Sequence, residues 1–510
     1  MTESTTGSVS IDGHALRLGD VEEVARRGRP AHLDQRAAPA IEASRHAVDR
    51  IAATGKPTYG VNTGLGALST AAIDSADART LQHNLLRSHA AGSGTLLAAD
   101  TVRAIMLIRA NSLAAGYSGV RVAVVERLLD VLNAGITPAI PSQGSLGASG
   151  DLAPLAHLGL VLTGEGQVVD ESGTSRAVGP YLEAAGIEPL ELKAKEALAI
   201  INGTAAMAGL AALSLVDSER LLRTATIAAG LSAYAIGARR EPFDPRLHDA
   251  RAHRGQRVVA RAMRDLLGPF DESLRKSARV QDPYSIRCIP PAFGAALDAL
   301  GPLRTALEIE INSATDNPLI FADSDEALSG GNFHGHPLAL PIEYAKVAIA
   351  SLGTITERRI ALLMDAGEYG LPAFLVANPG LNSGYMIAHY LTAGLVAENR
   401  VLAHPSAVDS IPTSANIEDF NSMGTTGARH LTEVVRNVER IVAVEMLCAA
   451  QACDLRSVQP EGRLGACYQI VRDHVPLLEA DDRIIANEIE TVTQLVRSGG
   501  LASHLDGEFD

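Results

Sequence analysis

Residues 431–447 read LTEVVRNVERIVAVEML, and their apolar side chains recur at intervals of three and four residues. That spacing places the apolar side chains along one side of an α-helix. The segment 342–363 repeats the pattern, and 100–134 and 206–235 are rich in alanine and leucine with few helix breakers. We therefore predict a mostly α fold whose core is a bundle of long helices. The apolar stripe of the first segment consists of Leu431, Val434, Val435, Val438, Ile441 and Val442.

Strand signals are sparse, and the best one lies at the N-terminus. Residues 9–11 are followed by Asp12-Gly13, a dipeptide typical of a hairpin turn, and residues 16–18 are the expected returning strand. Strands and helices do not alternate along the chain, which argues against a doubly wound sheet. We expect a small N-terminal part, 1–220, that carries glycine-rich active-site loops, and a long-helix part, 221–510, interlocked in one body.

Charge and composition narrow the possible partners. The chain has 510 residues, with 44 Lys and Arg against 59 Asp and Glu and a net charge of −15. Because no basic tract offsets this charge, we expect neither nucleic acid nor an anionic membrane as a partner. Residues 197–216 are free of charge over a length that could span a bilayer, but they are mostly alanine and are interrupted at 202–204. A buried helix is the better interpretation.

The cysteines indicate the cellular compartment. Four cysteines are too few and too scattered for a disulfide framework. The first residues, MTESTTGSVSIDG, lack the positive start and apolar region of a secretory signal. We expect free thiols and a cytoplasmic protein.

Glycine and proline gather in discrete loops that also carry polar and aromatic residues. Such loops on a rigid helical scaffold are a common setting for functional sites. The loops span residues 55–66, 135–150, 281–294 and 329–337.

The loop around Ser149 reads SQGSLGASGDLAPLAH over residues 142–157. It is no nucleophile elbow, because Asp151 stands where that motif needs a second glycine, and its simplest interpretation is a turn before a helix. Another chemistry is open to these residues. The nitrogen of Gly150 is unhindered by a Cβ and could attack the carbonyl of Ala148. Loss of water from the ring and from Ser149 would then give 4-methylidene-imidazole-5-one (MIO), an electrophile that no side chain provides.

The octapeptide 148–155, ASGDLAPL, closely resembles the self-cyclising motif of the aromatic amino acid lyase family. This family comprises histidine, phenylalanine and tyrosine ammonia-lyases and the related 2,3-aminomutases. Further blocks match in the same order from Tyr59 to about Arg456, which is nearly the whole chain. The resemblance implies a carbon–nitrogen lyase whose MIO group forms from Ala148, Ser149 and Gly150, without a diffusible cofactor.

Other matching blocks imply roles for single residues. Tyr59, in YGVNTG, resembles the family's general base, a role that requires a lowered pKa or a nearby charge because a neutral phenol is a weak base. Asn202, in INGT, resembles the asparagine that contacts the prosthetic ring and the substrate amine, although asparagine also caps helices. Phe333, in GNFH, resembles the aromatic residue beside the prosthetic group. His334 and His336 are too few ligands for a metal site, so we expect none.

The segment QDPYSIR, residues 281–287, resembles the family loop that receives the substrate carboxylate. Arg287 offers the planar, permanently charged fork that a carboxylate needs, although a structural ion pair is the alternative. Gln281 would assist orientation, and Tyr284 would belong to the catalytic set. The resemblance also implies a homotetramer in which each active site draws loops from three subunits.

The pair Ser88-His89 indicates the substrate. It resembles the pair found in histidine enzymes, whereas the pair at this position resembles His-Leu in tyrosine enzymes and Phe-Leu in phenylalanine enzymes. An imidazole has one donor and one acceptor, so a polar partner suits it better than apolar walls do. Glu418 also resembles the histidine enzymes, and it could hydrogen-bond the imidazole or assist proton transfer. L-histidine, converted to trans-urocanate, is therefore the expected substrate.

Several positions depart from the histidine pattern. Ile417 replaces the usual glutamine, Phe420 the usual histidine, and His336 an acid. Ala205 replaces a glutamine, and Ile289 replaces a polar residue. These departures leave the lyase residues intact. They keep open a lyase or 2,3-aminomutase acting on another aromatic or modified amino acid, and a catalytically silent scaffold remains the third alternative.

Overall fold

The computed structural model describes residues 7–74, 77–269, 271–479 and 481–509. These residues are mostly α-helical, as predicted, and the chain divides into two compact units. Unit 1 contains the described residues up to Leu213 together with Pro302–Glu343 and Pro405–Arg429. Unit 2 contains Ser214–Gly301, Tyr344–His404 and the described residues from His430 onward.

The chain changes unit inside several long helices. The expected division at residue 220 lies near the first change, which falls within α9 (Ala205–Ala235). The segments 302–343 and 405–429 of unit 1 come from beyond that point in the sequence. Unit 1 therefore combines residues that are hundreds of positions apart.

The N-terminal strands pair in a different way from the expected hairpin. Strand β1 (Val9–Ile11) pairs in parallel with β2 (Ala31–Leu33), and α1 (Leu18–Arg27) connects them. The predicted returning strand at 16–18 is wrong, because Leu16 and Leu18 are buried on the approach to α1 rather than paired with β1. Three-residue strands carry too little pattern for the sequence to specify their partners.

Unit 1 surrounds its glycine-rich loops with short helices and two-stranded pairs. Strand β3 (Ser93–Leu96) pairs antiparallel with β4 (Pro141–Gln143), which leads into the Ser149 loop. The alanine- and leucine-rich segment 100–134 forms two helices, because Gly116 and Gly119 have positive φ angles and interrupt it. The remaining strands of the unit are β5 (Gln167–Val169), β6 (Ser175–Ala177), β7 (Leu319–Phe321) and β8 (Glu326–Leu328). Its other helices are α2 (Ala38–Ala53), α3 (Ala78–His89), α4 (Ala99–Ala114), α5 (Val122–Asn133), α6 (Leu152–Leu162), α7 (Gly179–Ala185) and α8 (Glu196–Ile201).

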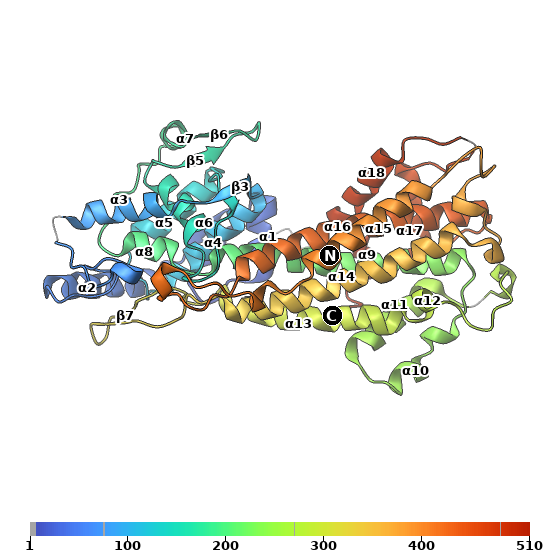
Figure 1. The fold of residues 1–510 in the computed structure, drawn as a ribbon, viewed down its shortest axis with the longest axis horizontal. Helices are drawn as coiled ribbons and strands as arrows, with labels where there is room; N and C mark the ends of the chain where they lie inside the picture. Colours follow the sequence, from blue (N-terminus) through green and yellow to red (C-terminus); the bar gives the residue numbers. More distant parts are fainter. Residues whose placement is uncertain (1–6, 75–76, 270, 480, 510) are drawn as a thin grey trace. The chain divides into compact units, whose positions relative to one another are not determined.

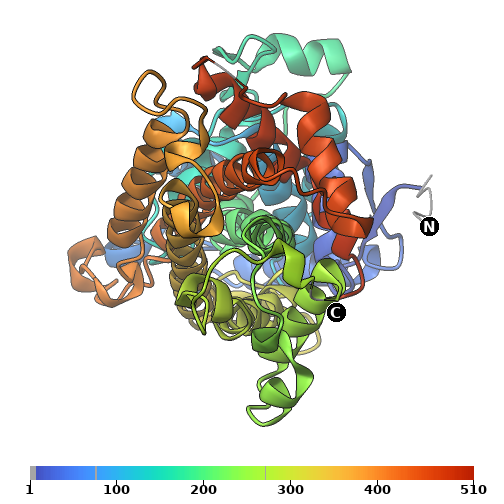
Figure 2. The same ribbon diagram turned by 90° about the vertical axis from the view of Figure 1, so that its right-hand side faces the viewer.

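Unit 2 is built on long helices held by apolar packing and by a buried polar cluster around Glu445. The apolar stripe predicted at 431–447 is confirmed, since each of its residues is at most 2% exposed within α16 (Gly424–Leu455). Glu445 of α16 accepts hydrogen bonds from Ser232 of α9 and from Arg359 of α14 (His336–Met364). The Arg359 guanidinium also lies 5.0 Å from the Phe293 ring of α13 (Ile289–Glu310). Figure 1 shows these helices running alongside one another, and Figure 2 gives the view turned by 90°.

The other helices of unit 2 are shorter. They are α10 (Pro245–Asp249), α11 (Arg254–Leu267), α12 (Tyr284–Arg287), α15 (Met386–Leu402), α17 (Gly462–His474) and α18 (Ile485–Ser498).

The charge-free stretch 197–216 is not a continuous helix. It is divided between α8 and α9 by the turn at 202–204, and its residues are buried. Among the described residues, α14 alone is long and apolar enough to cross a membrane by length and composition. This is weak evidence for a membrane span, because 56% of that window is buried inside the protein, as in the core helix of a soluble protein.

Candidate active site

The Ala148-Ser149-Gly150 turn is seated against a second turn, at Asn202-Gly203-Thr204. Gly150 and Gly203 form an isolated β-bridge, and the N–H of Asp151 donates to the carbonyl of Gly203 at 2.7 Å. Gly150 has a φ of +68°, and a Cβ at this position would lie 2.3 Å from the Gly203 carbonyl oxygen. Only glycine fits this left-handed, closely approached position.

The side chain of Asp151 anchors the Ala148-Ser149-Gly150 turn. Its buried carboxylate accepts hydrogen bonds from Ser145 at 2.8 Å, from the N–H of Met207 at 2.8 Å and from the Thr425 hydroxyl. Burial raises the pKa of Asp151, and these donors oppose the rise. Because Met207 lies in the first turn of α9, the carboxylate also faces the positive end of the helix dipole.

Ser149 is held from two sides. Its hydroxyl donates to Oε1 of Glu418 at 2.7 Å, and its carbonyl accepts from Nδ2 of Asn202 at 2.8 Å. The other carboxylate oxygen of Glu418 accepts from the Thr413 hydroxyl at 3.0 Å. The Oδ1 atom of Asn202 is buried and has no hydrogen-bond partner among the described residues. It is therefore free to accept a hydrogen bond beside the turn.

These contacts bring most of the predicted residues together. A pocket of about 770 Å³ in unit 1 is lined by both polar and apolar residues and includes Ala148 and Ser149 of the turn. Gly150, the third residue of the turn, is not among the residues that line the pocket. The predicted residues that line the pocket are Tyr59, Ser88, His89, Ala148, Ser149, Asn202, Phe333 and Glu418.

The electrostatics of Tyr59 oppose its expected role as a base. Burial raises the pKa of the Tyr59 phenol, and the negative charges of Glu418 and Asp316 raise it further. The N–H of Gly66 donates to the phenolic oxygen at 3.3 Å and opposes the rise only in part. Within the described chain, Tyr59 therefore keeps its proton at neutral pH.

His89 presents a neutral imidazole. Burial lowers its pKa below the ordinary histidine value. Its Nδ1 lies 2.9 Å from the carbonyl oxygen of Leu85 and 3.0 Å from the Ser88 hydroxyl. Since a carbonyl oxygen only accepts, Nδ1 carries the proton, and Nε2 remains the acceptor nitrogen.

His334, His336 and Phe420 stack on one another at the edge of the pocket. Their ring centroids are 5.0–5.7 Å apart. The described residues contain no group of three His, Cys, Asp or Glu side chains placed to hold a metal. His334 and Phe420 line the pocket and His336 stacks on both of them, so the departures at 336 and 420 from the histidine pattern are in mutual contact.

The QDPYSIR segment lies in unit 2. Gln281 and Arg287 line a separate pocket of about 320 Å³. The Arg287 guanidinium lies 4.4 Å from the centre of the Tyr284 ring, and Tyr284 is 69% exposed. None of these three residues lines the pocket that contains Ser149.

Sequence reasoning missed several residues that support the site. Thr413 and Thr425 bind the two key carboxylates, and Asn317 lines the pocket. Nothing near these residues in the sequence singles them out, because their role comes from contact with Glu418 and Asp151. A threonine that serves a distant carboxylate has no local pattern.

Comparisons with known proteins agree with the fold. The aromatic amino acid lyase family matches residues 16–473 of the chain. The histidine ammonia-lyase of Streptococcus gordonii is 45% identical over 509 residues, which are 99% of each chain. The crystal structure of histidine ammonia-lyase from Trypanosoma cruzi has a TM-score of 0.90 at 38% identity and covers 98% of this chain and 95% of its own. Tyrosine aminomutase from Streptomyces globisporus has a TM-score of 0.92 at 38% identity, with 98% and 99% covered. The chain therefore belongs to the aromatic amino acid lyase family.

Proposed function

We propose that this enzyme eliminates ammonia from L-histidine to give trans-urocanate. The observation that carries the proposal is the pocket, which places a neutral His89 and the carboxylate of Glu418 around the Ser149 turn. Both groups accept hydrogen bonds, the first through Nε2 and the second through its carboxylate, and they suit an imidazole ring because its N–H can donate to either of them. The full-length similarity to histidine ammonia-lyases supports the same substrate.

We also propose that Ala148, Ser149 and Gly150 mature into the MIO group. The residues fit the MIO group. Glycine is the only residue type that position 150 accepts, and the unpartnered Oδ1 of Asn202 is available to accept a hydrogen bond beside the turn. The MIO group, once formed, would supply an electrophile that makes the substrate's amino nitrogen a better leaving group. Intact mass spectrometry tests this step, because maturation removes two water molecules from the chain.

The remaining residues would bind the substrate and move its proton. Arg287 would hold the α-carboxylate, with Gln281 and Tyr284 beside it, and Phe333 would pack near the turn. Tyr59 would take the β-proton, which requires that a cation lower its pKa. Since the charges near Tyr59 in the described chain raise its pKa, we propose that another copy of the chain supplies that cation.

Because the proposed site needs a cation from another copy of the chain, we propose a homotetramer with shared active sites. Unit 2 exposes apolar side chains on α14 and α15 that a neighbouring copy would cover. They are Tyr344, Val347, Ile387, Tyr390, Leu391 and Val401. The four free cysteines support a cytoplasmic location.

Subunit complementation tests the shared site. Assayed at an L-histidine concentration below the KM of the unaltered enzyme, Ser149→Ala alone should be inactive and Arg287→Ala alone strongly impaired, whereas their co-expression should restore part of the activity, since mixed oligomers contain some intact sites. Mixed oligomers that form without any recovery would contradict site sharing.

A tyrosine-type 2,3-aminomutase is the second candidate. It is favoured by the structural similarity to tyrosine aminomutase and by the apolar residues Ile417 and Phe420 at the pocket. The deciding experiment incubates the purified enzyme with L-histidine, L-phenylalanine and L-tyrosine and follows the products by absorbance and chromatography. Urocanate supports the proposal, a β-amino acid supports the aminomutase, and no turnover of any of the three supports a silent scaffold.

A further inference from the structure

The segment that leads to Gln281 and Arg287 has little regular structure of its own. Between η4 (Glu272–Leu274) and α12, no residue belongs to a helix or strand. The helix α12 is only one turn long, and its first hydrogen bonds run from the N–H groups of Ile286 and Arg287 to the carbonyl of Pro283, at 3.0 Å each. The carbonyl of Pro283 therefore anchors the N-terminal end of the turn that carries Arg287.

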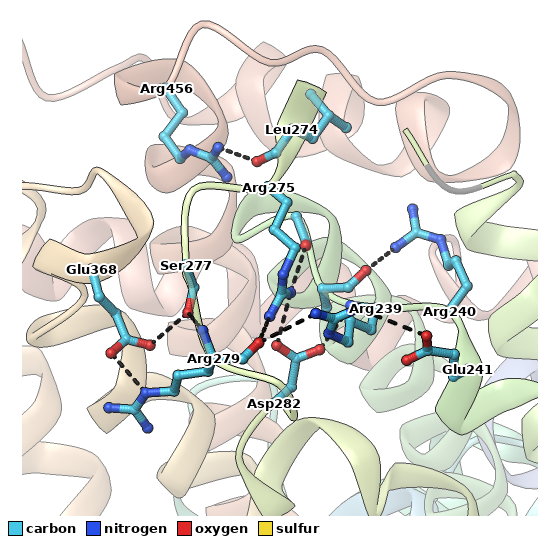
Figure 3. A network of polar contacts seen from close by, with 12 residues as sticks. Arg239, Arg240, Glu241, Leu274, Arg275, Ser277, Arg279, Asp282, Glu368 and Arg456 are labelled. Atoms are coloured by element: carbon cyan, nitrogen blue, oxygen red, sulfur yellow. Dashed lines mark hydrogen bonds and ion pairs between the residues drawn. The ribbon is translucent and has the colours of Figure 1, made fainter. Parts of the chain in front are cut away.

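Asp282, the neighbour of Pro283, is fixed in a buried polar network (Figure 3). The residue is 3% exposed, and its side chain is fully buried. Its carboxylate accepts from the backbone N–H of Arg239 at 2.7 Å and from Nη1 of Arg275 at 3.1 Å. A buried carboxylate with both oxygens engaged holds the backbone beside it tightly, because leaving the charge unpaired would be costly.

Arg275 joins both ends of the same segment. Besides Asp282, its guanidinium donates to the carbonyl of Arg279 at 2.7 Å and to that of Gly237 at 3.4 Å. The side chain is 10% exposed. The planar fork thus ties the segment to the end of α9, and Arg456 makes a further tie by donating to the Leu274 carbonyl.

A second tie on the same segment is exposed. Arg279 pairs with Glu368 at 2.7 Å, with side-chain exposures of 58% and 33%. Glu368 also accepts from Ser277 at 3.2 Å. Solvent screens such a pair, so its loss should move the segment much less than the loss of the buried pair does.

We propose that Asp282 and Arg275 are positioning residues that aim Arg287 at the substrate carboxylate. The inference rests on the proposed carboxylate-binding role of Arg287. It assigns to Asp282 an effect on one part of the ligand only: the carboxylate end depends on it, and the imidazole end does not.

The test compares Asp282→Asn, Arg287→Ala and Glu368→Gln with the unaltered enzyme. Each is assayed for the KM and kcat of L-histidine and for inhibition by histamine, which is L-histidine without its carboxylate. Misplacing a clamp by a fraction of an ångström to one ångström should raise the KM by about tenfold or more. We expect this for Asp282→Asn and Arg287→Ala, with histamine inhibition unchanged within about twofold, and no change in either quantity for Glu368→Gln.

The outcomes separate the inference from the proposed function. No turnover of L-histidine by the unaltered enzyme, or an unchanged KM in Arg287→Ala, would overturn the proposed function. An altered KM in Arg287→Ala with an unchanged KM in Asp282→Asn would overturn the positioning role alone. Equal weakening of L-histidine and histamine in Asp282→Asn would also overturn it, because that result indicates general damage.

A second variant covers the case in which Asp282→Asn does not fold. Arg275→Lys keeps the charge for Asp282 but cannot also bind the Arg279 carbonyl through a planar fork. We expect a smaller rise in the KM for L-histidine than in Asp282→Asn, and we expect inhibition by histamine to stay unchanged within about twofold. An unchanged KM in a folded Arg275→Lys enzyme, with its intact mass showing the mature turn, would refute the proposal.

Discussion

Replacing Gly150 by alanine should both destabilise the folded chain and prevent maturation of the Ala148-Ser149-Gly150 turn. A left-handed residue with a side chain costs about 1–2 kcal/mol. The added Cβ would also lie 2.3 Å from the Gly203 carbonyl oxygen, within backbone atoms that cannot rotate away. Overpacking of this kind costs about 1–3 kcal/mol, so the free energy of unfolding should fall by about 2–5 kcal/mol in total.

Gly186 provides the matched control. Its φ is +66°, close to the +68° of Gly150, and a Cβ there would meet nothing within 4 Å. Gly186→Ala should therefore cost only the backbone term of about 1–2 kcal/mol and should mature normally. Gly150→Ala should retain the two water molecules, because the clash moves the residue-150 nitrogen away from its seat on Gly203.

The assay has three readouts on the two variants. Urea unfolding gives the free energies, intact mass gives the fraction of matured chains, and urocanate absorbance gives the activity. A Gly150→Ala enzyme that loses both waters and is as stable as Gly186→Ala would refute the argument that Gly203 holds the turn for cyclisation.

Three further predictions follow from burial and charge. Glu418→Gln should lower kcat/KM for L-histidine by about tenfold to a hundredfold, since a charge-assisted hydrogen bond becomes a neutral one; a steady-state assay in which kcat/KM stays within twofold would contradict this. His248→Gln should cost about 1–2 kcal/mol in urea unfolding at pH 7 by disrupting the hydrogen bonds of His248 to Gln256 and Pro242. Burial lowers the pKa of His248 below the ordinary 6.5, so its stabilising effect is complete above pH 6.5 and is lost as the pH falls through the folded-state pKa. The cost should therefore be smaller at pH 5, and an equal or larger cost there would refute the sign. Under native conditions at pH 8 a thiol reagent should modify only Cys288, which is partly exposed. Burial raises the pKa of the thiols of Cys448, Cys453 and Cys467, that of Cys467 to about 12. Early reaction of any of these three cysteines would contradict their packing.

Much of the helical framework was predictable because its signal is local. The stripe in α16 repeats every three to four residues, and every position of it is buried as expected. The N-terminal hairpin was wrong because strand pairing depends on a partner that the strand itself does not specify, and β1 found β2 beyond α1. The helical segment 100–134 is interrupted where Gly116 and Gly119 take positive φ angles, a feature that composition alone does not reveal.

The candidate site divides in the same way. Tyr59, His89, Ser149, Asn202 and Glu418 were identified from their own motifs, and the pocket brings all five together. Thr413 and Thr425 escaped notice because a threonine becomes important only when a carboxylate from elsewhere lies against it.

By itself the sequence determined the long helices, the Ala148-Ser149-Gly150 turn and the residue types available for chemistry, since periodicity and backbone freedom act over a few neighbours. The tertiary structure decided how those groups behave. It raised the pKa of Tyr59 by burying it near Glu418 and Asp316. It placed Arg287 in unit 2, outside the pocket of Ser149, and locked Gly150 against Gly203. Burial, charge proximity and steric closeness are properties of space, and they join residues that lie far apart along the chain.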